Sequence, residues 1–286
     1  MDLIKAIIFG IIEGITEWLP VSSTGHLILV KSFMQFTHVT DPKEFFDMFE
    51  VVIQLGAILA VVLLYFKNIW PFTKTKSKAI TKSGILSHFD KEITNLWGKI
   101  LVSCVPAAII GLLFDEKFEE LFYNPTCVAL ALIIFGIAFI VIENWHKGQK
   151  SRVNSVAGIT YKDALIIGLF QLLAARFPGV SRSGATIIGA LLIGISRKTS
   201  AEYTFYLAVP VMFGASLLKV VKFGLHFTGL EFAALILGMI SAFIVSMFII
   251  KFLMNYIKKH NFIVFGKYRI ALGVLVLILG WFGVIA

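Results

Sequence analysis

The feature that most constrains this chain is a series of apolar runs, each long enough to cross a lipid bilayer. About 20 mostly apolar residues span the hydrocarbon core. Hydrophobic residues make up 58% of the sequence and charged residues only 15%, against about half and a quarter in a soluble domain. The sequence therefore predicts an all-α polytopic membrane protein with six full spans, at 46–66, 98–114, 126–143, 203–221, 229–250 and 270–286.

Two further apolar stretches are broken in the middle. Pro20 interrupts residues 1–35, and Pro178-Gly179 interrupts residues 160–196. Proline removes a backbone donor and clashes with the preceding helical turn, so each stretch predicts two short helices joined by a polar turn. Broken helices at membrane depth persist only inside protein or around a wet cavity. We therefore expect two re-entrant helix pairs within one integral membrane domain.

The basic residues, which give the chain a net charge of +9, lie mainly between the apolar runs. This distribution is typical of the positive-inside bias of membrane loops rather than of nucleic-acid binding. Three segments would be cytoplasmic loops, namely 67–99, 144–162 and 251–269, with Lys67, Lys74, Lys76, Lys78, Lys82, Lys91, Lys99, Lys147, Lys150, Arg152, Lys162, Lys251, Lys258, Lys259, Lys267 and Arg269.

An acidic segment, 115–120, fits a loop on the outer side of a bacterial plasma membrane, with both termini outside. Lys219 and Lys222 fall on the outer side in this topology, which conflicts mildly with the positive-inside rule. The topology places the two broken stretches in opposite directions.

An internal repeat accompanies that inversion, because an offset of 158 residues relates similar residues in the two halves. The halves would be 1–143 and 160–286, joined by a linker at 144–159. Inverted repeats with broken helices commonly place a site at their interface near the bilayer midplane. The matching positions are Gly10 with Gly168, Glu13 with Gln171, Pro20 with Pro178, Ser23 with Ser181, Glu44 with Glu202, and Gly56-Ala57 with Gly214-Ala215.

The first break carries two acids. Glu13 and Glu17 are four residues apart and share one helix face. Carboxylates inside a membrane are costly and repel each other, and a divalent cation bridging them would relieve both problems because hard cations prefer carboxylate oxygens. The alternative is that the first helix lies at the membrane interface and these carboxylates face water.

Hydroxyls and a histidine follow Pro20. Ser22, Ser23 and Thr24 precede an apolar run, and His26 lies about one turn further on. One of the hydroxyls would cap the helix, and the free N–H groups of that helix end suit phosphate. A hydroxyl beside an imidazole suggests a nucleophile and a base, although a lone histidine can equally be structural.

The second break repeats this logic with an arginine added. Ser181, Arg182, Ser183 and Thr186 follow Pro178-Gly179. A guanidinium can hold phosphate oxygens through two parallel hydrogen bonds, and the alternative is an arginine that extends toward the membrane surface. Arg176, before the break, is a weaker candidate. Together the two motifs supply what phosphoryl transfer needs, where positioning and charge neutralisation dominate.

These motifs closely resemble the undecaprenyl-diphosphatase family, also called the bacitracin-resistance proteins. The resemblance covers nearly the whole chain and is strongest in EGITEWLPVSSTGHL at 13–27, FEVVIQLGAILAVV at 49–62 and PGVSRSGATI at 178–187. It implies hydrolysis of undecaprenyl diphosphate to undecaprenyl phosphate and inorganic phosphate at the outer face, which recycles the lipid carrier of peptidoglycan precursors. It also implies a Mg²⁺ or Ca²⁺ cofactor, an inverted repeat with two re-entrant pairs, and protection against bacitracin, which sequesters the diphosphate.

By motif position, the resemblance makes Glu13 and Glu17 the essential acidic pair and potential cation ligands. Ser23 resembles the proposed nucleophile and His26 a candidate base or acid. The second, phosphate-binding motif would comprise Ser181, Arg182 and Thr186, with Ser22, Thr24 and Ser183 as further substrate-binding hydroxyls. One departure is an extra residue in 171–177, before Pro178, which leaves the family position of Arg176 open.

The mechanism expected from these residues has Ser23, assisted by His26, attacking the terminal phosphorus, or water attacking directly. Two other functions remain to be weighed. Inverted repeats with broken helices are typical of transporters, so the chain could move a lipid phosphate or anion. The acid-phosphatase-like lipid phosphatases share a motif like Thr24-Gly25-His26, but their other motifs are not seen here. The expected partners are a polyprenyl diphosphate and the bilayer, and a homodimer is one possible assembly.

Overall fold

The structure is a computed structural model that describes residues 1–73, 75, 78–81, 84–122, 124–224 and 226–285, and leaves the side chains of 110–121 undescribed. Within these ranges the chain is helical, with isolated bridges in place of strands. The α-helices are α1 (Asp2–Thr16), α2 (Ser23–Phe33), α3 (Pro42–Val52), α4 (Gln54–Leu64), α5 (Phe66–Ile69), α6 (Lys91–Phe122), α7 (Pro125–Trp145), α8 (Tyr161–Arg176), α9 (Arg182–Leu192), α10 (Arg197–Phe223), α11 (Gly229–Tyr256) and α12 (Ile263–Trp281).

Five of the six predicted spans correspond to helices long and apolar enough to cross a membrane. They are the nearly continuous α3–α4 unit, α7, α10, α11 and α12. The sixth, 98–114, lies within α6, whose side chains from 110 to 121 fall outside the described residues. The polytopic all-α class is therefore confirmed, whereas the path of each broken pair through the membrane stays a prediction.

Three predicted loops are shorter than expected. Residues 115–120 continue α6 instead of forming a loop, because four of the six are Glu or Lys, which favour helix. The helix ends at Phe122, before Pro125 begins α7. The segment 67–99 includes α5 and the start of α6, and 251–269 includes the end of α11 and the start of α12. Lys74, Lys76 and Lys82, and the acidic side chains of 115–120, lie outside the described residues.

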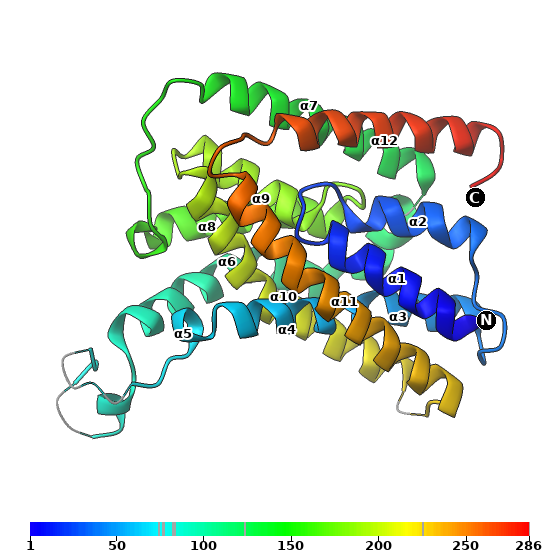
Figure 1. Cartoon of the computed structure of the whole chain (residues 1–286), viewed down its shortest axis with the longest axis horizontal. Coiled ribbons are helices and arrows are strands. Elements are labelled where there is room, and N and C mark those ends of the chain that lie inside the picture. Colours follow the sequence, from blue (N-terminus) through cyan, green and yellow to red (C-terminus); the bar gives the residue numbers. More distant parts are fainter. Residues whose placement is uncertain (74, 76–77, 82–83, 123, 225, 286) are drawn as a thin grey trace.

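Helices from the two halves of the chain pack against each other. The amino-terminal helix α1 lies along α11, α8 lies along α6, and α7 runs beside α12 (Figure 1). Small residues permit these close approaches, as is typical of helix contacts in membranes. Gly10 contacts Gly238 of α11, and Gly136 of α7 and Gly266 of α12 contact each other's backbone. The division into inverted repeats stays a prediction.

Both predicted breaks are present. The helix α1 ends at Thr16 before α2 begins at Ser23, and α8 ends at Arg176 before α9 begins at Arg182. Ser22 and Ser181 cap the second helix of each pair, accepting from the amides of Gly25 and Gly184.

These two serines share an unusual backbone. They are the non-glycine residues with positive φ in the described chain, at 74° and 69°, a conformation that persists only when its surroundings enforce it. By conformation Ser181 therefore matches Ser22, not Ser23 as the constant offset predicts. The reason is that two residues separate Pro178 from its cap, Ser181, whereas one residue separates Pro20 from Ser22.

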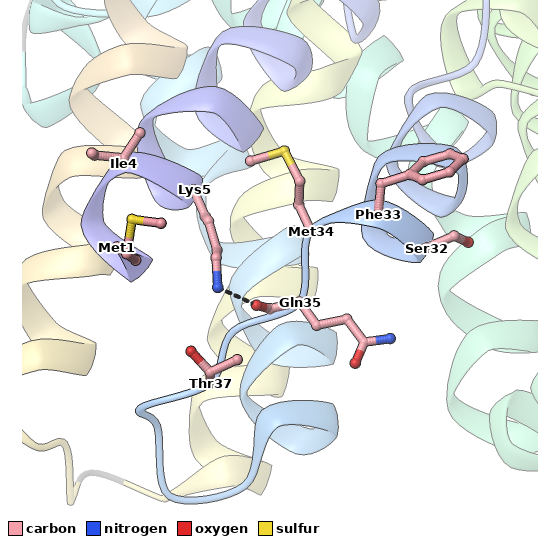
Figure 2. Close-up of a pocket in the computed structure, with 8 residues that line it drawn as sticks. All are labelled: Met1, Ile4, Lys5, Ser32, Phe33, Met34, Gln35 and Thr37. Atoms are coloured by element: carbon pink, nitrogen blue, oxygen red, sulfur yellow. Dashed lines mark hydrogen bonds between the residues drawn. The ribbon is translucent and has the colours of Figure 1, made fainter.

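A hollow of about 530 Å³ lies at the amino-terminal end, lined by Met1, Ile4, Lys5, Ser32, Phe33, Met34, Gln35 and Thr37 (Figure 2). Lys5 donates to the carbonyl oxygen of Gln35 at 2.5 Å and to Asp2 at 2.8 Å. Burial alone would raise the pKa of Asp2, but hydrogen bonds from Lys5, Thr37 and His38 outweigh it and hold the pKa below its ordinary value. This hollow contains none of the predicted site residues.

The contact between α4 and α11 gives a test of the packing. A Cβ on Gly56 would lie 2.0 Å from the carbonyl oxygen of Met239, a backbone atom that cannot rotate away. We expect Gly56→Ala to lower the free energy of unfolding in detergent by about 1–3 kcal/mol, as overpacking does. Gly214→Ala is the matched control, because nothing lies within 4 Å of its Cβ position. Equal stability of the two variants would contradict the close contact.

Candidate active site

The carboxylate of Glu17 joins the two breaks. The Ser23 hydroxyl donates to Glu17 Oε2 at 2.9 Å, and Arg182 Nη2 donates to Glu17 Oε1 at 2.9 Å. Ser23 belongs to the first break and Arg182 to the second, and the side chains of Glu17 and Arg182 are both largely buried. A hydroxyl from one motif and a guanidinium from the other therefore meet at the carboxyl group of Glu17, and the two breaks lie together as the sequence predicted.

Arg182 is held in place by more than this ion pair. Its Nη1 donates to the carbonyl oxygen of Thr204 on α10 at 3.0 Å, and its buried Nε has no partner in the described part of the chain. A guanidinium has five N–H donors in a fixed fork. Arg182 thus keeps donor capacity for a ligand after its protein contacts are made.

Ser183 and Thr186, which follow Arg182, bind backbone carbonyl oxygens. Ser183 donates to the carbonyl oxygen of Glu17 at 3.1 Å, which is a second link between the breaks, and its hydroxyl lies 3.2 Å from that of Ser181. Thr186 donates to the carbonyl oxygen of Arg182 at 2.9 Å and contacts the Thr204 hydroxyl at 2.9 Å. In this structure the hydroxyls of Ser183 and Thr186 face protein groups.

Glu13 lies one helical turn before Glu17 and is fully buried, and both its carboxylate oxygens lack a hydrogen-bond partner among the described residues. A buried carboxylate without a partner is costly, and a hard cation is the natural partner for such oxygens. Within the described residues no three acidic, histidine or cysteine side chains form a ligand group. The two unpartnered oxygens of Glu13 are of the kind that hard cations prefer, and Mg²⁺ commonly takes only one or two carboxylates with water and substrate phosphate as its other ligands.

His26 is close to the site but does not bind Ser23 in the described structure. Its Nδ1 lies 2.7 Å from the carbonyl oxygen of Ser22, and its Nε2 lies 2.8 Å from the hydroxyl of Tyr268 on α12. The expected pairing of Ser23 with His26 is thus replaced by the pairing of Ser23 with Glu17. Thr24 is half-buried in the first turn of α2, and Arg176 is buried at the end of α8.

Arg269 is the most important residue that the sequence prediction placed wrongly. It was assigned to a cytoplasmic loop, yet it is fully buried in α12. Its Nη2 donates to the carbonyl oxygens of Gly179 and Val180 at 2.8 Å each, and its Nη1 donates to that of Pro20 at 3.3 Å. The apolar run begins directly after Arg269, a place where an arginine is expected to extend to the membrane surface, so the sequence carries no clear signal of its burial.

Arg269 supplies the next test. Replacing it by leucine removes the donors for three buried carbonyl groups, and leaving such groups unpaired costs about 1–3 kcal/mol each. We expect Arg269→Leu to lower the free energy of unfolding in detergent by several times the change in Lys267→Leu. Lys267 is the matched control because it is an exposed cation on the same helix. If both variants were equally stable, the guanidinium would not be holding the two breaks.

The chain was also compared with known proteins. The family model described as bacitracin resistance protein BacA matches residues 6–275. The undecaprenyl-diphosphatase of Desulfitobacterium hafniense is 57% identical over 278 residues, covering 97% of this chain and 96% of the relative. Undecaprenyl-diphosphatase 1 of Clostridium acetobutylicum is also 57% identical, covering 97% of each chain. The undecaprenyl-diphosphatase of Enterococcus faecalis is 52% identical, covering 98% of this chain and 97% of the relative. The chain is therefore a multi-pass membrane protein that belongs to the BacA family of bacitracin resistance proteins.

Proposed function

We propose that this protein hydrolyses undecaprenyl diphosphate to undecaprenyl phosphate and inorganic phosphate. The observation that carries the proposal is the Glu17 carboxylate, which accepts hydrogen bonds from a candidate nucleophile and from a candidate phosphate-binding arginine. The three relatives above, each matching nearly the whole chain, are named undecaprenyl-diphosphatases. The family's description as bacitracin resistance proteins agrees with hydrolysis of the lipid diphosphate, which would remove the molecule that bacitracin sequesters.

Substrate binding would use the second break. The diphosphate enters between the two breaks while its polyprenyl tail remains in lipid. Arg182 holds phosphate oxygens with the donors that its protein contacts leave, and the helix ends at Ser22 and Ser181 present further N–H groups. The tail contributes apolar area, whereas the polar breaks select the diphosphate group.

In the chemical step, Ser23 Oγ attacks the terminal phosphorus and its proton passes to Glu17, the group to which its hydroxyl already donates. The bond from phosphorus to the bridging oxygen breaks, which leaves undecaprenyl phosphate and a phosphoserine. Water then attacks the phosphoserine, the bond from phosphorus to Ser23 Oγ breaks, and the proton held by Glu17 returns to Ser23 Oγ as inorganic phosphate leaves. Direct attack of water on the diphosphate, with Glu17 as base, is the alternative route, and trapping of a phosphoserine at Ser23 distinguishes them.

Glu13 and Glu17 are the residues that would hold a divalent cation. When bound, Mg²⁺ or Ca²⁺ would neutralise phosphate charge and thereby favour attack by an oxygen nucleophile. Glu13 is the stronger candidate ligand, since both its oxygens lack hydrogen-bond partners in the described structure, whereas Glu17 already binds Ser23 and Arg182.

We propose further that the pocket opens to the outer face of the plasma membrane. The support is the distribution of basic residues between spans, with Lys78, Lys91 and Lys147 among those outside the long helices or at their ends. Hydrolysis there would return the lipid carrier to peptidoglycan synthesis.

The test is phosphate release by purified protein in detergent from undecaprenyl and farnesyl diphosphates. We expect Glu17→Gln to lower kcat by roughly 10²–10⁴, the usual contribution of a proton-transferring group. Ser23→Ala and Arg182→Ala should also be strongly impaired. Glu44→Gln is the matched control, because Glu44 is exposed in the first turn of α3.

Two further arms complete this assay. A chelator should abolish phosphate release, and Glu13→Gln should need more cation for half-maximal activity than wild type. Phosphate release in detergent requires no second compartment, so it supports an enzyme rather than a transporter. Transfer of lipid phosphate across liposomes without phosphate release, or near-normal turnover of Glu17→Gln, would overturn the proposal.

A further inference from the structure

Both ring nitrogens of His26 are occupied by protein groups. Nδ1 lies 2.7 Å from the carbonyl oxygen of Ser22, and Nε2 lies 2.8 Å from the Tyr268 hydroxyl. The two rings also stack, with centroids 5.6 Å apart and planes 7° from parallel. A histidine whose two ring nitrogens are both bound to protein groups has a single orientation relative to the first break.

The hydrogen-bond partners settle the form of the neutral imidazole. A carbonyl oxygen only accepts, so Nδ1 carries the hydrogen and Nε2 carries the lone pair. The Tyr268 hydroxyl therefore donates to Nε2. If Nε2 takes up a proton, the same hydroxyl oxygen can accept from it, because a phenol is both donor and acceptor. The contact thus survives in both protonation states.

The position of Tyr268 follows from its neighbour in sequence. Arg269 fixes this part of α12 against the first break through the carbonyl oxygen of Pro20, and against the second break through Gly179 and Val180. Tyr268 is itself 47% exposed, so burial of its ring does not account for its place beside His26. Its specific contacts are the ring stack and the hydrogen bond.

We propose that Tyr268 is a positioning residue for His26 in the hydrolysis proposed above, on which this inference rests. The phenol holds the imidazole plane and fixes the tautomer in which Nδ1–H donates to the carbonyl oxygen of Ser22, the neighbour of Ser23, whose proton passes to Glu17. Tyr268 acts through His26 and does not itself contact the reacting atoms. It lies outside the two polar motifs and comes from the last helix of the chain.

Tyr268→Phe tests this role, because phenylalanine keeps the ring stack and removes only the hydroxyl. We expect kcat to fall about tenfold with KM nearly unchanged, a part of the roughly 10²–10⁴ that a positioned acid or base contributes. Tyr256→Phe is the matched control. Tyr256 stacks on His260 with ring centroids 4.5 Å apart, away from the breaks, and its variant should retain wild-type kcat.

A double-mutant cycle separates positioning from a general structural effect. In a His26→Gln background, Tyr268→Phe should cause no further loss, because the residue through which it acts is gone. An undiminished tenfold loss in that background would contradict the proposal. So would wild-type kcat in the single variant.

Nitrogen-15 NMR of labelled histidine gives a readout that does not depend on turnover. The chain has six histidines, and His26→Gln identifies the resonances of His26. Tyr268→Phe should shift the Nε2 signal of His26, while Tyr256→Phe leaves it unchanged. If Tyr268→Phe shifts the Nε2 signal but the unmutated protein releases no phosphate, the proposed function is rejected and the contact is kept. An unchanged Nε2 signal in an active enzyme would reject the positioning role alone.

Discussion

The ion pair between Glu17 and Arg182 is the interaction on which the rest of the site depends. It joins residues 165 positions apart in sequence and lies where water has little access. Removing one partner of such a pair leaves an uncompensated buried charge, which costs about 3–5 kcal/mol. Since Ser23 binds the same carboxylate, the pair also fixes the candidate nucleophile. Structure and proposed chemistry therefore share one carboxyl group.

Further hydrogen bonds and close helix contacts hold the two breaks together inside the helical bundle. Arg269 and Ser183 bind carbonyl oxygens of the breaks, which helix geometry cannot satisfy there. The glycines of α1 and α4 let both helices approach the backbone of α11. The helix caps at Ser22 and Ser181 adopt positive φ. Such strain is retained where the surroundings enforce it and is frequent at functional sites.

Local sequence was sufficient to predict the two breaks and five spans that the structure bears out. The convergence of the polar residues of the two breaks was predicted from the internal repeat at an offset of 158 residues. Pro20 and Pro178 mark the breaks because proline acts within one helical turn. The same local patterns could not place Arg269 or Tyr268, because each acts through a partner more than 80 residues away. They also could not choose the partner of Ser23. His26 is nearer in sequence, but the turn directs the serine hydroxyl to Glu17 and the imidazole to Ser22 and Tyr268.

The most direct measurement of the central claim is a double-mutant cycle on Glu17→Gln and Arg182→Gln, read as the free energy of unfolding in SDS titration. Groups in direct contact couple by about 0.5–3 kcal/mol, whereas independent sites add within about 0.5 kcal/mol. We predict that the double variant loses less free energy of unfolding than the sum of the two single losses, because neither charge is then left alone. Simple additivity would show that the two breaks do not meet at this carboxylate.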